Sequence, residues 1–224
     1  MALTIPEIQE RLRTGKVQPY PPPIPNSPRH WYEQQFSEEQ LWQAQCRAKK
    51  KQSTLAKKYG AFNNLVQDSG TRWVGDLGEI AFADMLKTHY GFVENIDFTR
   101  WTNEEDIDRR DFSLVLPQRT LEIDVKTMTT SVKPLLKYRS NVNARQWRKI
   151  EFDSQVNCLV FCYFVKPLNT VYVLGWLLKE EFIAKATFVK AGEMTHKIRA
   201  NTDLYTIENE KLRPFSKVLV SSEN

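Results

Sequence analysis

The chain has 224 residues, of which 41% are hydrophobic and 12% aromatic, so it can bury a sizeable core in one large domain or two small ones. It has no run of about 18 apolar residues, as a membrane-spanning helix needs, and its first residues lack the apolar stretch of a signal peptide. These features exclude a helical membrane protein, and we expect a globular, cytoplasmic protein with no membrane partner.

Residues 1–36 are predicted to form a proline-rich arm. Residues 4–13 have the pattern of a short amphipathic helix, and the prolines of "YPPPIPNSPRH" favour an extended, semi-rigid segment. Residues 37–62 predict a basic helical extension, which begins with a capping box formed by Ser37 and Gln40. Its lysines would either contact phosphates or simply keep the helix soluble.

A second helix is predicted from Asn64 to Tyr90, with Glu79 at the edge of its apolar stripe. Gly75 and Gly78 lie within about one turn of Glu79. A glycine in a helix interior costs about 1 kcal/mol relative to alanine. We therefore expect a close approach at this point, either by backbone or substrate, or by a sheet on which the helix packs.

Strands dominate the next part of the chain, at residues 92–98, 111–116 and 120–127, with a turn at Pro117 and Gln118. They predict a three-stranded meander. The acidic residues concentrate here, because residues 94–111 contain seven acidic and three basic side chains.

The segment after the meander is basic: seven basic residues and no acidic ones lie between Lys126 and Lys149, in a chain whose net charge is only +5. An acidic cluster followed by a basic one is typical of a metal-dependent site that acts on a polyanion. A charged surface without a partner gives the same pattern, and the sequence leaves both interpretations open.

The C-terminal half alternates helices and strands, which we predict as a helix at 141–152, a buried strand at 157–165, a strand at 170–177 and a helix at 178–186. The tail from residue 191 to 224 is predicted to be extended and packed on the core. The order of elements predicts an α/β fold, a three-layer α/β/α sandwich around a central mixed β-sheet, with its core at residues 63–190.

The heptapeptide "LEIDVKT" at residues 121–127 places Glu122, Asp124 and Lys126 on one face of a strand and apolar residues on the other. An amphipathic strand with one face in water has the same alternation. The neighbouring strand, however, brings Asp111 within reach, and the preceding helix supplies Glu79. Two carboxylates about 4 Å apart repel by about 4 kcal/mol at an effective dielectric of 20, so the cluster predicts a hard cation, Mg²⁺ or Mn²⁺.

Thiol and imidazole chemistry has no support in the sequence. The three histidines are scattered, and Cys46, Cys158 and Cys162 do not have the spacing of zinc ligands or of a Cys-His nucleophile. We expect all three thiols to be buried or inert, so any catalysis depends on carboxylates.

These residues resemble the PD-(D/E)XK nuclease superfamily, which includes many restriction endonucleases, lambda-type exonucleases and archaeal Holliday junction resolvases. Asp111 matches the first acidic position, Asp124-Val125-Lys126 matches the (D/E)xK element, and "GDLGEIAF" matches the helix that supplies a glutamate in many members. Arg110 stands where the name-giving motif has proline. The resemblance covers about residues 64–185.

The resemblance implies a restriction endonuclease-like fold and a Mg²⁺-dependent deoxyribonuclease, an endonuclease of the restriction, repair or phage and mobile-element type. Glu79, Asp111, Asp124 and the Val125 carbonyl would bind Mg²⁺ (or Mn²⁺), and Lys126 would orient or help deprotonate the attacking water. Glu122 would be a further ligand or only a salt-bridge partner.

DNA phosphates would be bound by the basic residues that follow, with Tyr138 and Trp147 available to stack or pack and Thr127, Thr129 and Thr130 to donate hydrogen bonds. The basic residues are Lys133, Lys137, Arg139, Arg145, Arg148 and Lys149. An RNA substrate, a homodimer, and a catalytically silent nucleic-acid-binding module of the same fold remain open alternatives.

Overall fold

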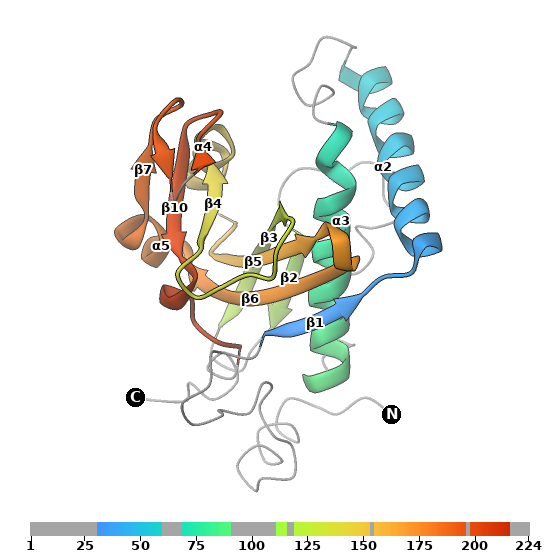
Figure 1. Ribbon diagram of the computed structural model, residues 1–224, viewed down its shortest axis with the longest axis horizontal. Coiled ribbons are helices and arrows are strands. Elements are labelled where there is room, and N and C mark those ends of the chain that lie inside the picture. Colours follow the sequence, from blue (N-terminus) through green and yellow to red (C-terminus); the bar gives the residue numbers. More distant parts are fainter. Residues whose placement is uncertain are drawn as a thin grey trace, which may run out of the picture.

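The computed structural model describes residues 31–59, 69–90, 111–115, 119–152, 155–195 and 198–215, and shows a mixed α/β fold (Figure 1). The helix expected at residues 4–13, the strand expected at 92–98 and the turn at Pro117 and Gln118 lie outside these ranges. None of the helices in the described ranges combines the length and apolarity that crossing a membrane requires.

A mixed five-stranded sheet forms the centre of the molecule, in the order β1-β6-β5-β3-β2. Strands β3 and β5 run parallel, and every other neighbouring pair in this sheet is antiparallel. The strands are β1 (Tyr32–Gln35), β2 (Phe112–Val115), β3 (Thr120–Thr130), β5 (Cys158–Val165) and β6 (Thr170–Leu178). The predicted antiparallel arrangement of the strands at 111–116 and 120–127 is confirmed, whereas residues 32–35, placed in the arm by the sequence, form an edge strand.

Strand β5 is buried along its whole length, as its continuous apolar sequence predicts. Alternate residues of β5 therefore enter two different cores. Val160 packs in the core beneath the helix α3 (Ser69–Met85), and Leu159 packs in the core on the opposite face. Both faces of β5 are thus buried, as its continuous apolar sequence predicts.

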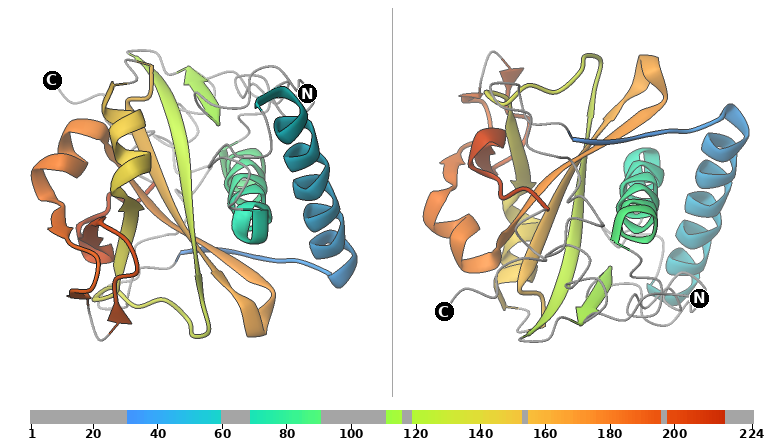
Figure 2. Two further views of the ribbon diagram at one scale, coloured as in Figure 1. Left: turned by 90° about the horizontal axis from the view of Figure 1, so that it is seen from above. Right: turned by 90° about the horizontal axis from the view of Figure 1, so that it is seen from below.

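Two helices cover the first face in successive layers. The helix α3 lies against the sheet, and α2 (Glu38–Tyr59) lies on the outer side of α3 (Figure 2). The predicted capping box starts α2, since the Gln40 backbone N–H donates to Ser37 Oγ at 3.2 Å and the Ser37 N–H donates to Gln40 Oε1 at 2.8 Å. After Met85 the helix continues as one π-helical segment, Leu86–Tyr90.

The helix predicted at 141–152 is wrong in its first residues. Strand β4 (Arg139–Asn143) precedes a shorter helix, α4 (Ala144–Phe152). Ser140 and Val142 lie two positions apart and are both buried, which is the pattern of a strand. The strand that pairs with β4 is β10 (Leu204–Glu208), which lies more than sixty positions further along the chain. A local reading of the sequence does not reveal this distant partner.

The C-terminal tail is also more ordered than the sequence predicts. Strands β4, β10 and β7 (Thr187–Val189) form a second sheet, and β8 (Met194–Thr195) pairs with β9 (Ile198–Arg199). The predicted helix at 178–186 is confirmed as α5 (Lys179–Lys185). The described residues also include two short 3-10 helices, η3 (Lys166–Leu168) and η4 (Asn209–Lys211).

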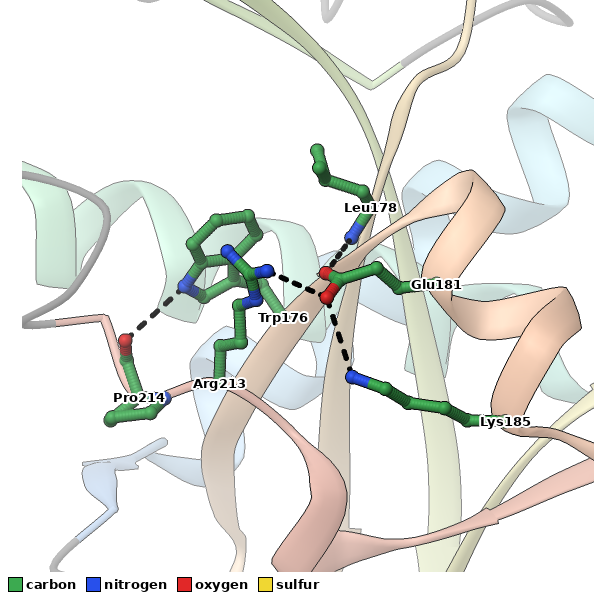
Figure 3. Close-up of polar contacts among 6 residues, drawn as sticks. All are labelled: Trp176, Leu178, Glu181, Lys185, Arg213 and Pro214. Atoms are coloured by element: carbon green, nitrogen blue, oxygen red, sulfur yellow. Dashed lines mark hydrogen bonds and ion pairs between the residues drawn. The ribbon is translucent and has the colours of Figure 1, made fainter. Parts of the chain in front are cut away.

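Arg213 fastens the end of the described chain to β6 (Figure 3). Its backbone exchanges hydrogen bonds of 3.0 and 2.9 Å with Trp176, and its guanidinium pairs with Glu181 at 2.6 Å. A side chain at Gly175 has no room, because a Cβ there would lie 2.5 Å from the Arg213 carbonyl oxygen. The Trp176 indole N–H donates to the Pro214 carbonyl at 3.2 Å, so tail and strand hold each other in place.

The three thiols are free, but they differ in exposure. Cys158 and Cys162 are buried as predicted, and burial raises the pKa of both thiols far above its ordinary value. Cys46, on α2, is exposed, so of the two alternatives expected for the thiols, buried or inert, burial does not apply to it.

Candidate active site

Strand β3 carries two oppositely charged side chains on the face that turns away from α3. Asp124 and Lys126 form an ion pair, with Lys126 Nζ 2.6 Å from Asp124 Oδ2, and their side chains are 15% and 17% exposed. Residues two apart on a strand lie on the same face, so the strand itself keeps this pair together. The apolar residues between and before them, Ile123 and Val125, pack in the core under α3, as the alternation predicts.

Asp111 stands directly before β2 and reaches across to β3. Its backbone N–H donates to the Ile123 carbonyl at 2.9 Å, and its Oδ2 accepts a hydrogen bond of 2.6 Å from the Val125 backbone N–H. The ladder between β2 and β3 ends at the pair Phe112 and Ile123. The Asp111 carboxylate therefore takes the place of the next backbone acceptor at this edge of β3.

Glu79 approaches the same place from α3. Its charge acts on both Asp111 and Lys126, although it lies on the helix side of the sheet. Contacts thus bring Asp111, Asp124 and Lys126 together on β3, and the negative charge of Glu79 acts on Asp111 and Lys126.

The electrostatics of the cluster favour an additional positive charge. The pKa of Asp111 is raised well above its ordinary value, first by burial and then by the negative charges of Glu79 and Asp124, while Lys126 and the Val125 N–H oppose the rise. Burial lowers the pKa of Lys126, but Asp124, Asp111 and Glu79 outweigh it and the pKa is raised overall. One ammonium group therefore faces three carboxylates in a mostly buried position.

The side chains fit a hard divalent cation in ligand type and in charge. Carboxylate oxygens are the ligands that Mg²⁺ prefers, and a cation would relieve the repulsion that raises the pKa of Asp111. Their side chains are not, however, arranged around a common point as the ligands of a bound metal ion are. Among the described residues, no group of three or more His, Cys, Asp or Glu side chains is placed to hold a metal ion. Binding would require side-chain rotation, beginning with the Lys126 ammonium group that now contacts Asp124.

Glu122 lies on β3 two residues before Asp124, and therefore on the same face of the strand. The Ser113 hydroxyl donates to Glu122 Oε1 at 3.1 Å, and the Glu122 backbone is held by Asn157, whose Oδ1 accepts from its N–H at 2.9 Å. Glu122 was expected to be a metal ligand or a salt-bridge partner, and its side chain instead accepts this hydrogen bond between β2 and β3.

The six basic residues predicted to bind nucleic acid separate into two groups. Lys133 pairs with Glu33 of β1 at 2.8 Å in an exposed ion pair, and Arg139 of β4 pairs with Glu208 of β10 at 3.1 Å, so both already have acidic partners. The other four are exposed and form no ion pair within the described residues: Lys137, Arg145, Arg148 and Lys149.

Two residues predicted near the substrate have structural contacts instead. Trp147 is 2% exposed and packs against Phe182, so of the two roles left open for it, stacking and packing, the structure shows packing. The side chain of Thr127 lies against Gly78 of α3. The sequence signalled the close approach at Gly78 but not the residue that it meets.

Comparison of the chain with family models, with curated proteins and with solved structures gave no match.

Proposed function

We propose that the protein is a Mg²⁺-dependent nuclease of the PD-(D/E)XK type that hydrolyses phosphodiester bonds in DNA, most simply as an endonuclease. One observation carries the proposal. The Asp111 carboxylate is hydrogen bonded to the backbone of Val125, in the middle of the Asp124-Val125-Lys126 element, and interacts electrostatically with Glu79. The contact between the two halves of the motif, which are separated in sequence, and the charge effect of Glu79 on Asp111 support this proposal.

The arrangement of elements supports a restriction endonuclease-like, three-layer α/β/α sandwich within this proposal. The glutamate helix α3 covers one face, the antiparallel pair β2 and β3 carries the two aspartates, and the chain then passes through α4 to β5, which is parallel to β3. In such a sandwich, α4 and α5 form the layer opposite α3. Both contribute to the core on that opposite face, through Trp147 and Phe182.

Glu79, Asp111, Asp124 and the Val125 carbonyl would hold the metal ion. The N–H and C=O groups of one strand residue point to the same side, so the Val125 carbonyl faces the edge at which Asp111 accepts from the Val125 N–H. When bound, Mg²⁺ supplies polarisation of a phosphoryl oxygen and a lowered pKa for a coordinated water.

Lys126 contributes positive charge beside the scissile phosphate. Its ammonium group is held at the site by Asp124, at 2.6 Å, and its raised pKa keeps it protonated near neutral pH. A protonated amine aimed at the phosphate stabilises the negative charge that develops as the bond breaks. A compact ammonium group on a flexible chain suits a position beside a nucleophile better than a planar guanidinium.

The charge of α4 supports a nucleic acid as the substrate, and DNA is the form proposed. Trp147 and Ile150 on its inner face share a core with Leu159 and Phe161, the register partners of Asp124 and Lys126. Register partners lie on the same face of the sheet, so α4 covers the face that carries the ion pair. Its outer face presents Arg145, Arg148 and Lys149, which suit a phosphate backbone.

The test is cleavage of supercoiled, linear and branched DNA by the purified protein, with Mg²⁺, Mn²⁺ or a chelator. Asp124→Asn and Lys126→Ala are compared with the exposed-site controls Glu210→Gln and Lys166→Ala. We expect metal-dependent cutting that both site variants lose and both controls keep. Binding without cutting in every protein supports instead a silent nucleic-acid-binding module, and cutting of RNA alone corrects the substrate.

A further inference from the structure

Phe152, the last residue of α4, is an aromatic side chain that is almost fully exposed. It is 83% exposed, the largest value among the exposed large hydrophobic side chains of the described ranges. Single apolar side chains are common on protein surfaces, so this exposure alone indicates nothing. The side chains that surround Phe152 on the helix decide what it can contact.

Phe152 lies in the basic outer face of α4. Residues at positions i, i+3, i+4 and i+7 share one stripe of a helix. Four exposed residues of α4 have this spacing: Arg145, Arg148, Lys149 and Phe152. Glu151, the only acidic residue in the α4 sequence, lies about 100° around the helix from Phe152. The aromatic ring therefore shares its stripe with three cations and no carboxylate.

Both ends of α4 are fixed, so this stripe is presented on a firm support. At the start of the helix, the Arg145 backbone N–H donates to Asn143 Oδ1 at 2.9 Å. At its end, Lys179 Nζ donates to the carbonyl oxygens of Ile150 at 2.9 Å and Glu151 at 3.3 Å. The Lys179 ammonium group offsets the negative end of the helix dipole, which would otherwise repel a phosphate there.

The aromatic end of the stripe lies at the same end of the central sheet as the candidate active site. Lys179, which holds this end of α4, directly follows Leu178. Leu178 is the register partner of Cys158, and Cys158 is in turn the partner of Ile123. The Ile123 carbonyl accepts the hydrogen bond from the Asp111 backbone N–H. The row of paired residues thus connects the end of α4 with the start of β2.

The combination of a bare aromatic ring and three cations fits one class of partner. Phosphates bind to arginine and lysine, and nucleobases stack on aromatic side chains, so a nucleic acid satisfies both kinds of group. An apolar protein surface would leave the three cations without partners. In a continuous duplex the bases are already stacked on one another, so only an unpaired base can cover the ring.

We propose that Phe152 stacks on an unpaired base of a nucleic acid whose phosphates are bound by Arg145, Arg148 and Lys149. The preferred substrates are then DNAs with unpaired bases, such as bubbles, flaps or single-stranded tails, rather than continuous duplex. This inference rests on the proposed function, because it names the substrate class at the same interface. It concerns binding, and requires neither a metal ion nor cleavage.

The experiment measures binding of the full chain, in chelator, to two labelled DNAs of equal length and identical ends. One is fully paired, and the other has a central stretch of unpaired bases. The variants are Phe152→Ala, Phe152→Leu and Phe152→Trp, with Trp42→Ala as the matched control. Trp42 is 64% exposed on α2, but Glu38 and Glu39 precede it by one helical turn instead of cations. Circular dichroism checks that each variant is folded.

We expect the wild type to bind the DNA with unpaired bases at least about fivefold more tightly than the paired one, as stacking of one base predicts. Phe152→Ala and Phe152→Leu should lose this preference, because neither has an aromatic face. Phe152→Trp and Trp42→Ala should keep it. Phe152→Ala removes no charge, so the slope of log K against log salt should not change.

Equal affinity of the wild type for the two DNAs, or a preference that persists in Phe152→Ala, overturns the stacking inference but leaves the basic face of α4 as a phosphate-binding surface. A preference that persists in Phe152→Leu assigns the contact to a general apolar effect and also overturns stacking. Absence of DNA binding by the wild type removes the nucleic-acid interface, and this inference with it, whether or not the carboxylates of the candidate active site bind metal.

Discussion

The carboxylate of Asp111 accepts a hydrogen bond of 2.6 Å from the backbone N–H of Val125. This bond joins the start of β2 to the middle of β3, and it does so with a side chain rather than with the backbone. The same carboxylate is buried and repelled by Glu79 and Asp124. Asp111 is thus both a structural link and a carboxylate whose pKa is raised by burial and by neighbouring negative charges.

Asp111→Asn should separate stability from activity. The amide oxygen can still accept from the Val125 N–H, while the repulsion with Glu79 and Asp124 disappears. Without metal we expect the variant to be more stable by about 1 kcal/mol, which raises Tm by roughly 2 to 4 °C in a protein of this size. Cleavage should fall at least a hundredfold.

The measurement is thermal unfolding in chelator and in Mn²⁺, together with cleavage rates. Mn²⁺ should stabilise the wild type much more than Asp111→Asn, because ligand binding to the folded state raises its stability. A variant that is destabilised in chelator would contradict the repulsion argument. Glu210→Gln, at an exposed site, serves as the control and should change neither property.

The two groups of basic residues should respond differently to mutation. Arg148→Ala, on the exposed face of α4, should weaken DNA binding and reduce the slope of log K against log salt by about 1, without changing stability. Arg139→Ala should mainly destabilise the fold, because Arg139 pairs with Glu208 and contacts Thr206.

Fluorescence anisotropy of labelled duplex DNA at several salt concentrations measures the slope, and urea unfolding measures the stability. Lys166→Ala is the control for loss of a surface charge away from α4. An unchanged salt slope in Arg148→Ala would remove this residue from the interface.

Trp147→Ala should be strongly destabilising, by about 3 to 5 kcal/mol, since Trp147 is 2% exposed and packs against Phe182 and Tyr205. Trp147→Phe should lose much less. Urea unfolding gives both values. If Trp147→Ala kept its stability but lost DNA affinity, Trp147 would be a stacking residue after all.

The contact between Glu181 and Arg213 should make stability depend on pH. Burial raises the pKa of Glu181, but the hydrogen bonds from Arg213, the Leu178 N–H and Lys185 lower it further, so the net pKa lies below the ordinary value of 4.5. A lowered folded pKa stabilises the protein above the unfolded pKa, and the contribution is lost as pH falls through the folded pKa. We expect Glu181→Gln to be less stable than the wild type at pH 7, by up to about 1 kcal/mol for so exposed a pair.

Urea unfolding of both proteins at pH 7 and near pH 3 tests this expectation. The difference in unfolding free energy should shrink at the lower pH, where the Glu181 carboxylate becomes protonated. Glu180→Gln, at the neighbouring exposed position of α5, should show no such change. A difference that stays constant with pH would assign the effect of Glu181 to packing alone.

Much of the fold and part of the site follow from local sequence patterns. The alternation in β3, the capping box of α2 and the unbroken apolar run of β5 are properties of neighbouring residues, so the elements and their buried faces are predictable from the sequence. The grouping of Asp111 with Asp124 and Lys126 was predictable as well, because a short antiparallel pair connects them.

Contacts between distant segments were decided only by the tertiary structure. Strand β4 was mistaken for helix because its partner β10 comes from the tail, and Trp147 and Arg139 were assigned to the substrate because their partners Phe182 and Glu208 are remote in sequence. Burial and ion pairing depend on which surfaces meet, and the spacing of residues along one chain does not contain that information. The same reason applies to Gly78. A glycine inside a helix predicts a close approach, but only the packing of α3 on β3 shows that Thr127 is the residue that Gly78 meets.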